Sequence, residues 1–212
     1  QDFYRDDIFN GAVDNATGIA GMLEMAEAMK AEPLDRSVLI LAVTLEESGL
    51  LGSAHYAEDP TVPMNQIVAG INIDSLQPLG PTHDLVVIGY GASELEDRLG
   101  AVLELQDRVI APDPSPQAGS FYRSDHASFT KKGVPMLYAK HGTDVRDGGV
   151  AAGKAFAAAY TAQRYHKPMD EFDRNWDLSG ITENIEALYQ LTLGLAQSDD
   201  WPSWYPGNEF EA

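Results

Sequence analysis

The sequence contains no cysteine, few basic residues and no long apolar run. Without cysteine, the 212-residue chain has no disulfide framework, no thiolate metal site and no cysteine nucleophile. No apolar run approaches the roughly 20 residues of a membrane span, so we expect no membrane insertion. Only 14 Lys and Arg residues oppose 33 Asp and Glu residues, which gives a net charge of −19. Such a charge repels nucleic acid, excludes it as a partner, and favours cationic ligands such as the ammonium group of a peptide.

A hydrophobic content of 44% at this length is typical of a single globular domain, and we expect residues 1–212 to form one. The chain opens with Gln1 rather than Met. Residues 9–12 already have the composition of a functional loop, so we expect an N-terminally truncated chain whose upstream strands are missing.

The hydrophobic pattern alternates between helical and strand-like segments. Helices are expected at 15–30, 53–58, 93–106, 125–132, up to 163, and 178–197. Strands are expected at 37–45, 66–73, 84–89 and 134–138, with loops at 111–119 and 141–150 and a surface-bound aromatic tail at 201–212. This alternation predicts an α/β fold: a three-layer α/β/α domain with a mixed, mainly parallel central sheet.

Acidic residues follow two of the predicted strands at their carboxyl ends, where ligands gather in such sheets. Glu46 and Glu47 follow the first of these strands, and Asp74 follows the second. An unpaired charge at the end of the apolar strand before Asp74 would be costly, so a metal, a lysine or backbone amides must compensate it. Asp14 precedes a helix and could be an ordinary N-cap, although Gly11 nearby also lets the backbone approach an ion.

Neighbouring glutamates that leave a strand point in different directions, so they can take different roles. One can bind a metal while the other accepts a proton from water beside it. We assign Glu47 as the ligand and Glu46 as the general base, although exposed Glu-Glu pairs without function are common. His166 lies in an irregular segment with few apolar neighbours, which is compatible with a ligand and with a plain surface histidine. Three carboxylates and one imidazole are typical of hydrolytic zinc centres.

His126 belongs to the run Ser124-Asp125-His126, which has the composition of a catalytic triad. Consecutive residues cannot face one another as that relay requires, so we interpret the run as a pocket wall.

Five motifs occur in an order that resembles the bacterial co-catalytic zinc aminopeptidases, whose metallopeptidase family also contains the glutaminyl cyclases. They are Asn-Gly-Ala-Val-Asp-Asn at 10–15, Glu-Glu-Ser-Gly at 46–49, Asn-Ile-Asp at 72–74, Arg-Ser-Asp-His at 123–126 and Tyr-His-Lys-Pro-Met-Asp at 165–170. The resemblance implies a metal-dependent exopeptidase that removes N-terminal residues from peptides, and it suggests a secreted or periplasmic protein.

Carried over residue by residue, the resemblance implies that Asp14 bridges two zinc ions. Glu47 and His166 would complete the shell of one ion, and Asp74 would belong to the other. Glu46 matches the general base, and Tyr165 matches a position that hydrogen-bonds the tetrahedral intermediate in some members, which is a substrate-binding role.

The sequence departs from the family in lacking the second histidine ligand, which stands in a His-x-Asp element upstream of the bridging aspartate. None of the thirteen residues before Asp14 is histidine. One ion or none is therefore expected in this chain, and its activity is in doubt. Two alternatives stay open: a single-zinc glutaminyl cyclase-like acyltransferase and a non-catalytic peptidase-like binding domain. Missing strands should also expose a sheet edge that favours self-association.

Overall fold

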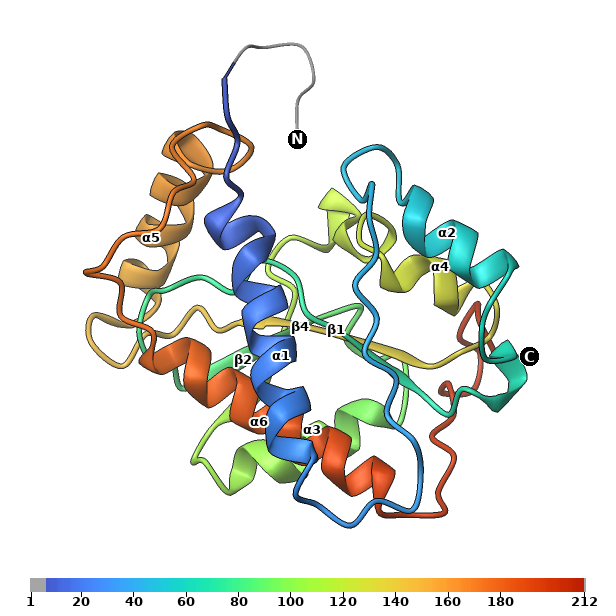
Figure 1. Cartoon of the computed structure of the whole chain (residues 1–212). Helices are drawn as coiled ribbons and strands as arrows, with labels where there is room; N and C mark the ends of the chain where they lie inside the picture. Colours follow the sequence, from blue (N-terminus) through green and yellow to red (C-terminus); the bar gives the residue numbers. More distant parts are fainter. Residues whose placement is uncertain (1–6, 212) are drawn as a thin grey trace.

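A computed structural model describes residues 7–211 of the chain. Four strands form one mixed sheet: β1 (Gly70–Asn72), β2 (Asp84–Ile88), β3 (Val109–Pro112) and β4 (Met136–His141). Their order is β1-β4-β2-β3, with β1 parallel to β4, β2 parallel to β3, and β2 antiparallel to β4. The sheet lies in the middle of the molecule, with helices in front of it and behind it (Figure 1).

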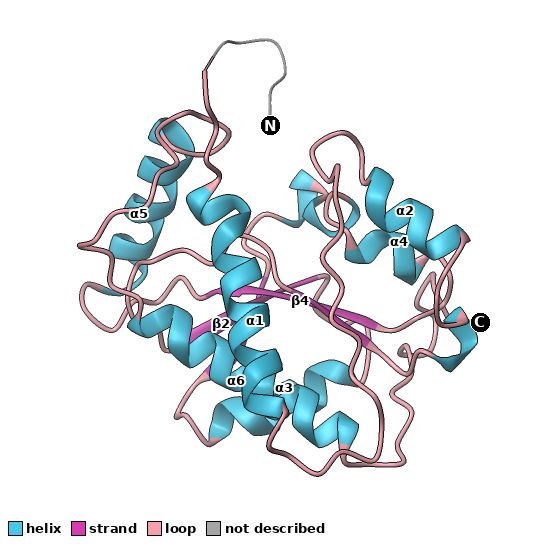
Figure 2. Ribbon diagram, viewed as in Figure 1, coloured by secondary structure: helices cyan, strands magenta, loops and turns pink. Residues whose placement is uncertain are grey.

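Six α-helices of the described part of the chain surround the sheet, and Figure 2 shows that helices make up more of the fold than strands. They are α1 (Gly18–Met29), α2 (Leu51–Glu58), α3 (Leu95–Glu104), α4 (His126–Thr130), α5 (Gly149–Gln163) and α6 (Ser179–Ala196). Short turns complete the described chain: η1 (Ala12–Thr17), η2 (Met64–Gln66), η3 (Pro116–Ala118) and η4 (Ser120–Tyr122). Among the described residues, no helix is long and apolar enough to cross a membrane.

The two faces of the sheet bury different side chains, because successive residues of a strand point to opposite faces. On one face, Leu85 and Val87 of β2 pack with Leu137 of β4 against helices α1, α3 and α6. On the other face, Val86 and Ile88 of β2 pack with the ring of Tyr138. Helix α4 contacts β4 and β1 as well as α2. The fold is therefore the expected α/β arrangement, with helical layers on both sides of a mixed sheet.

The predicted strand at residues 37–45 is wrong: this apolar segment forms no strand in the structure. Residues 37–43 make no backbone hydrogen bond to any described residue, and Leu39 and Ile40 are 49% and 41% exposed. Composition favours a strand here, but a strand also needs backbone hydrogen bonds to a neighbour, and residues 37–43 form none with the described segments. β1 is the last strand at one end of the sheet, and its edge facing away from β4 pairs with no described strand, so this edge is open.

Several other predicted elements change at their boundaries. The strand expected at 66–73 shortens to β1, because Gln66 belongs to η2 and residues 67–69 and 73 lie in no strand. The strand expected at 134–138 is observed as β4, which runs from Met136 to His141. The loop expected at 111–119 begins later, because β3 runs on to Pro112. Proline is tolerated there since β3 is an edge strand, which pairs only with β2. The tail packs against the surface of the domain, as predicted. The side chain of Trp204 is 6% exposed, and its indole Nε1 donates to the Gly133 carbonyl.

Candidate metal centre

Three side chains from distant parts of the chain meet at one point: Asp14, Glu47 and His166. The Nε2 atom of His166 lies 3.2 Å from Asp14 Oδ2 and 3.1 Å from Glu47 Oε1. One ligand atom from each residue lies within 4.8 Å of the other two. Two carboxylates and an imidazole at this spacing fit the donor set of a zinc-type cation.

The loop that carries Asp14 is irregular. Gly11 has φ 59° at its start, Asp14 and Asn15 depart from helical dihedrals within η1, and the peptide bond between these two residues is cis. The Asn15 carboxamide fixes the loop to the start of α1: its Oδ1 accepts the N–H of Gly18, the first residue of that helix, at 3.1 Å. A side chain at Gly18 would place a Cβ 2.2 Å from that same oxygen, so only glycine fits there.

Asn15 also joins the Asp14 loop to the residues around Asp74. Its Nδ2 donates to the Ile73 carbonyl at 2.9 Å, and its Oδ1 accepts the Ser75 N–H at 3.0 Å. Asp74 stands two residues after the end of β1, beyond the carboxyl end of the strand. The two predicted ligands Asp14 and Asp74 are thus held on loops that share one hydrogen-bonding side chain.

Asp74 lies outside the group of three. Its Oδ2 accepts hydrogen bonds from Ser124 Oγ at 2.7 Å and Tyr138 OH at 3.0 Å, and its Oδ1 accepts one from Ser75 Oγ at 2.8 Å. Hydroxyl groups therefore compensate this charge in place of the lysine or the backbone amides that the sequence left open. The hydrogen bonds fix the orientation of the carboxylate, and Oδ1, which accepts only one of the three, keeps further acceptor capacity.

Negative charge accumulates around the three residues. The pKa of Asp14 is raised by burial and by the charges of Asp74 and Glu47, against which the charge of His166 lowers it. Burial raises the pKa of Glu46 to about 8, together with the charges of Asp74 and Glu47. Carboxyl groups that oppose one another's ionisation in this way are a place where a bound cation would be stabilised.

Several residues of the centre or beside it adopt a left-handed backbone without being glycine. Leu45 precedes the glutamate pair with φ 58°, Ser75 follows Asp74 with φ 60°, and His166 itself has φ 54°. Each such residue costs of order 1 kcal/mol or more and persists only where its surroundings determine it. The direction of the Glu46, Asp74 and His166 side chains therefore depends on left-handed backbone at or next to these residues, which the surrounding packing stabilises.

Tyr165 stacks on His166, with ring centroids 3.8 Å apart and an interplanar angle of 28°. Burial raises the pKa of Tyr165 to about 12, with further contributions from the charges of Asp14 and Glu47. Its hydroxyl group consequently stays protonated at neutral pH and can donate a hydrogen bond.

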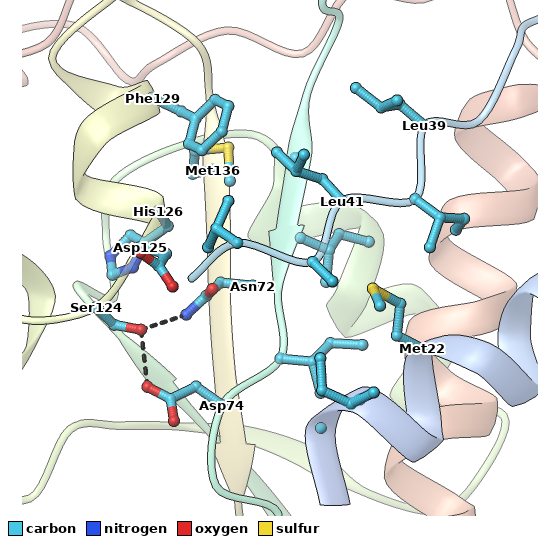
Figure 3. Close-up of a pocket in the computed structure, with 18 of the residues that line it drawn as sticks. Met22, Leu39, Leu41, Asn72, Asp74, Ser124, Asp125, His126, Phe129 and Met136 are labelled. Atoms are coloured by element: carbon cyan, nitrogen blue, oxygen red, sulfur yellow. Dashed lines mark hydrogen bonds between the residues drawn. The ribbon is translucent and has the colours of Figure 1, made fainter. Parts of the chain in front are cut away.

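A cavity of about 1080 Å³ opens beside the centre, between residues 36–45 and β1. Figure 3 shows Leu39 and Leu41 on one side of it, Phe129 and Met136 on another, and Asp74 at its polar end. The hydrogen bonds from Ser124 to Asp74 and from Asn72 to Ser124 close that end.

The segment around His126 lines the same cavity, in agreement with its interpretation as a wall. The His126 ring is 1% exposed and packs between Phe121 and Tyr138, with centroids 4.7 and 4.8 Å away. Neither of its ring nitrogens has a hydrogen-bond partner among the described residues. Burial lowers the pKa of His126 to about 4, so the imidazole is neutral at pH 7.

Sequence reasoning missed two residues that hold the centre together, Asn15 and Asp170. Asp170 is 1% exposed, and its carboxyl oxygens accept the backbone N–H groups of Val13 and Asp14. Both residues stand inside the predicted motifs, but a motif gives no indication that a side chain binds the backbone of another motif.

The family model of peptidase family M28 matches residues 3–192. Aminopeptidase YwaD of Bacillus subtilis (strain 168) is 48% identical over 48 residues, which cover 23% of this chain and 10% of that protein. The solved structure of an aminopeptidase from Aneurinibacillus sp. strain AM-1 superposes with a TM-score of 0.63 at 21% identity. That likeness covers 90% of this chain and 41% of the other, so the chain spans less than half of either relative.

Proposed function

The chain belongs to peptidase family M28, and from that premise we propose that it is a metal-dependent aminopeptidase. It would hydrolyse the first peptide bond of substrates that carry a free N-terminus. The observation that carries this proposal is the convergence of Asp14, Glu47 and His166, with ligand atoms within 4.8 Å of one another, beside a glutamate of raised pKa.

The residues present fit a divalent cation of the zinc type. Asp14, Glu47 and His166 would hold it, and the mutual repulsion of the neighbouring carboxylates would be relieved by its charge. Asp74 would serve a second ion only with further ligands, because its oxygens already accept three hydroxyl hydrogen bonds. When bound, such a cation supplies Lewis acidity to the reaction.

Glu46 is proposed as the general base. It follows Leu45, whose left-handed backbone turns the chain at the end of the apolar segment, and Glu47 points into the ligand group next to it. The pKa of about 8 belongs to the centre without a cation; the charge of a bound cation would lower it, so that Glu46 would be an ionised carboxylate able to accept a proton. Glu46 would take a proton from the attacking water at its carboxylate oxygen and pass it to the departing amine.

Tyr165 is proposed to bind the carbonyl oxygen of the scissile bond. Its hydroxyl is protonated at neutral pH and lies within the electrostatic reach of Asp14 and Glu47. A donor at this place would stabilise the negative charge that develops on that oxygen. The surrounding carboxylates favour a positively charged substrate group, such as the free α-ammonium of a peptide.

The test is release of p-nitroaniline from leucine p-nitroanilide after addition of Zn²⁺. Replacement of Glu46 by glutamine should lower kcat/KM by about 10²- to 10⁴-fold while the fold is kept, because a general base typically contributes that much. Glu58 on α2 offers a matched control: it is exposed and pairs with Lys132, so E58Q should retain the wild-type rate.

Equal rates for E46Q and the wild-type protein would exclude Glu46 as the base. Acetylation of the substrate amine should abolish turnover; undiminished turnover would contradict the requirement for a free N-terminus. A protein that binds Zn²⁺ but hydrolyses none of a panel of aminoacyl p-nitroanilides would refute the aminopeptidase proposal.

A second candidate is a single-zinc cyclase that forms pyroglutamate, and the group of exactly three ligand residues among the described ones favours it. It is distinguished by product analysis: mass spectrometry of a peptide with N-terminal glutamine would show loss of ammonia without cleavage of the peptide bond.

A further inference from the structure

We propose that Asp170 is a positioning residue that fixes the backbone of the Asp14 loop and so sets the distance between Asp14 and His166. The inference deepens the proposed function, since it concerns the same metal centre. It depends on a contact between two segments more than 150 positions apart in the chain, which neither motif reveals by itself.

Three consecutive amide groups of the Asp14 loop bind Asp170. The Ala12 N–H donates to the backbone carbonyl of Asp170 at 3.0 Å. The Val13 N–H lies 3.2 Å from both carboxyl oxygens, and the Asp14 N–H donates to Oδ2 at 3.1 Å. Successive amides at the start of a helical turn form a site for an anion, and here a side chain of the same protein occupies it.

The same short segment carries His166. The Asp170 N–H donates to the Lys167 carbonyl at 3.0 Å, and the Lys167 N–H donates to the Arg164 carbonyl at 2.9 Å, so the segment folds into consecutive turns. His166 thus reaches the Asp14 carboxylate from one side while Asp170 holds the Asp14 backbone from the other. Because Asp14 and His166 are held in this way, their spacing is set before an ion binds. This lowers the conformational free energy that ion binding has to supply.

Burial explains why this contact is strong. Asp170 is 1% exposed, and Val13 beside it is also 1% exposed, so water does not compete for these hydrogen bonds. A buried carboxyl group without partners would be costly, and here the Val13 and Asp14 amides supply them at 3.1–3.2 Å. Loss of the acceptor would leave buried amides unpaired and free the loop to shift.

The test compares the full-length wild-type chain with two Asp→Asn variants. In D170N, one acceptor oxygen becomes an NH₂ group that cannot accept from the Val13 or Asp14 amide. Asp84 provides the matched control: it is 6% exposed and accepts the consecutive amides of Thr143 and Asp144 at 3.0 and 2.8 Å. D84N therefore removes a similar carboxylate–amide contact without touching Asp14 or His166.

Two readouts are measured. Isothermal titration calorimetry with Zn²⁺ should show about 10- to 100-fold weaker binding for D170N, the range found when a partner that orients a ligand is removed, and no such loss for D84N. Amide hydrogen exchange of the metal-free proteins should be faster at residues 12–14 in D170N than in the wild type or in D84N.

Equal zinc affinity of D170N and the wild type would overturn the proposal, and so would equal losses in D170N and D84N. If the wild-type chain binds no Zn²⁺, the proposed function fails. The exchange experiment then tests the positioning role of Asp170 by itself, and unchanged exchange at residues 12–14 in D170N refutes that role. If D170N does not fold, D170E, which keeps both oxygens but displaces them by one methylene, is judged by the same two criteria.

Discussion

Protonation of His126 is expected to destabilise the folded protein in mild acid, while the raised pKa values of Glu46 and Asp14 act in the opposite direction. Its ring is 1% exposed between Phe121 and Tyr138 and has no polar partner among the described residues, so a proton on it would be buried without compensation. Burial lowers its pKa to about 4, the charge of Lys140 lowers it further and that of Asp74 opposes the shift. In the unfolded chain the same ring titrates near 6.5.

Because the folded-state pKa lies below the unfolded one, the unfolded chain binds more protons between these two values. The contribution of His126 is therefore fully present above pH 6.5 and is lost as the pH falls toward 4. The two pKa values give a loss of about 2 kcal/mol at pH 5 relative to pH 8, and about 3 kcal/mol below pH 4. His141 has a pKa lowered to about 4 by burial as well, so it adds a loss of the same sign.

Urea unfolding at pH 8, 7, 6 and 5 measures this effect. Replacement of His126 by phenylalanine keeps a ring between the two aromatic neighbours and removes the titrating group. The free energy of unfolding of H126F minus that of the wild type should therefore rise by about 2 kcal/mol between pH 8 and pH 5, because Glu46 and Asp14 titrate in both proteins. H55Q removes an imidazole from the exposed surface of α2 and is the control. Parallel pH profiles for H126F and the wild-type protein would refute the assignment of the acid sensitivity to His126.

Two further outcomes follow from packing and from the open edge of the sheet. Replacement of Asn184 by alanine removes the acceptor that lies 2.6 Å from the buried Arg108 guanidinium. It should lower the free energy of unfolding by about 1–3 kcal/mol, measured by urea denaturation, because a buried charge loses a partner; an unchanged midpoint would contradict this. Residues 37–43 and the open side of β1 should cause concentration-dependent self-association, seen by sedimentation velocity. L39K should reduce it, and a wild-type chain that stays monomeric at high concentration would exclude it.

The chemistry of the centre could be predicted from local sequence to a useful degree. Asp14, Glu47 and His166 stand in irregular segments that the sequence marks as sites for ligands. The rule that ligands gather at the carboxyl ends of strands holds for Asp74, which comes after β1, but not for Glu47, whose predicted strand does not form. The structure brings these three together, while the catalytic role of Glu46 and the binding role of Tyr165 stay predictions. The helices and the strands β2 and β4 were also predictable. The helical spacing of apolar residues and the apolar, β-branched runs of strands are local patterns that extend over a few neighbouring residues.

Interactions across the fold were not predictable in this way. The apolar composition of residues 37–45 favours a strand, but pairing depends on whether another backbone lies alongside, and none of the described segments does. Asp170 reads as an ordinary motif residue until the Asp14 loop is folded against it. The sequence by itself determined which donor groups are available and where helices and most strands form, because those properties depend on neighbouring residues. Only the tertiary structure decided which donors meet, which carboxyl groups raise one another's pKa and which backbone groups hold them, since these depend on distances between residues far apart in the chain.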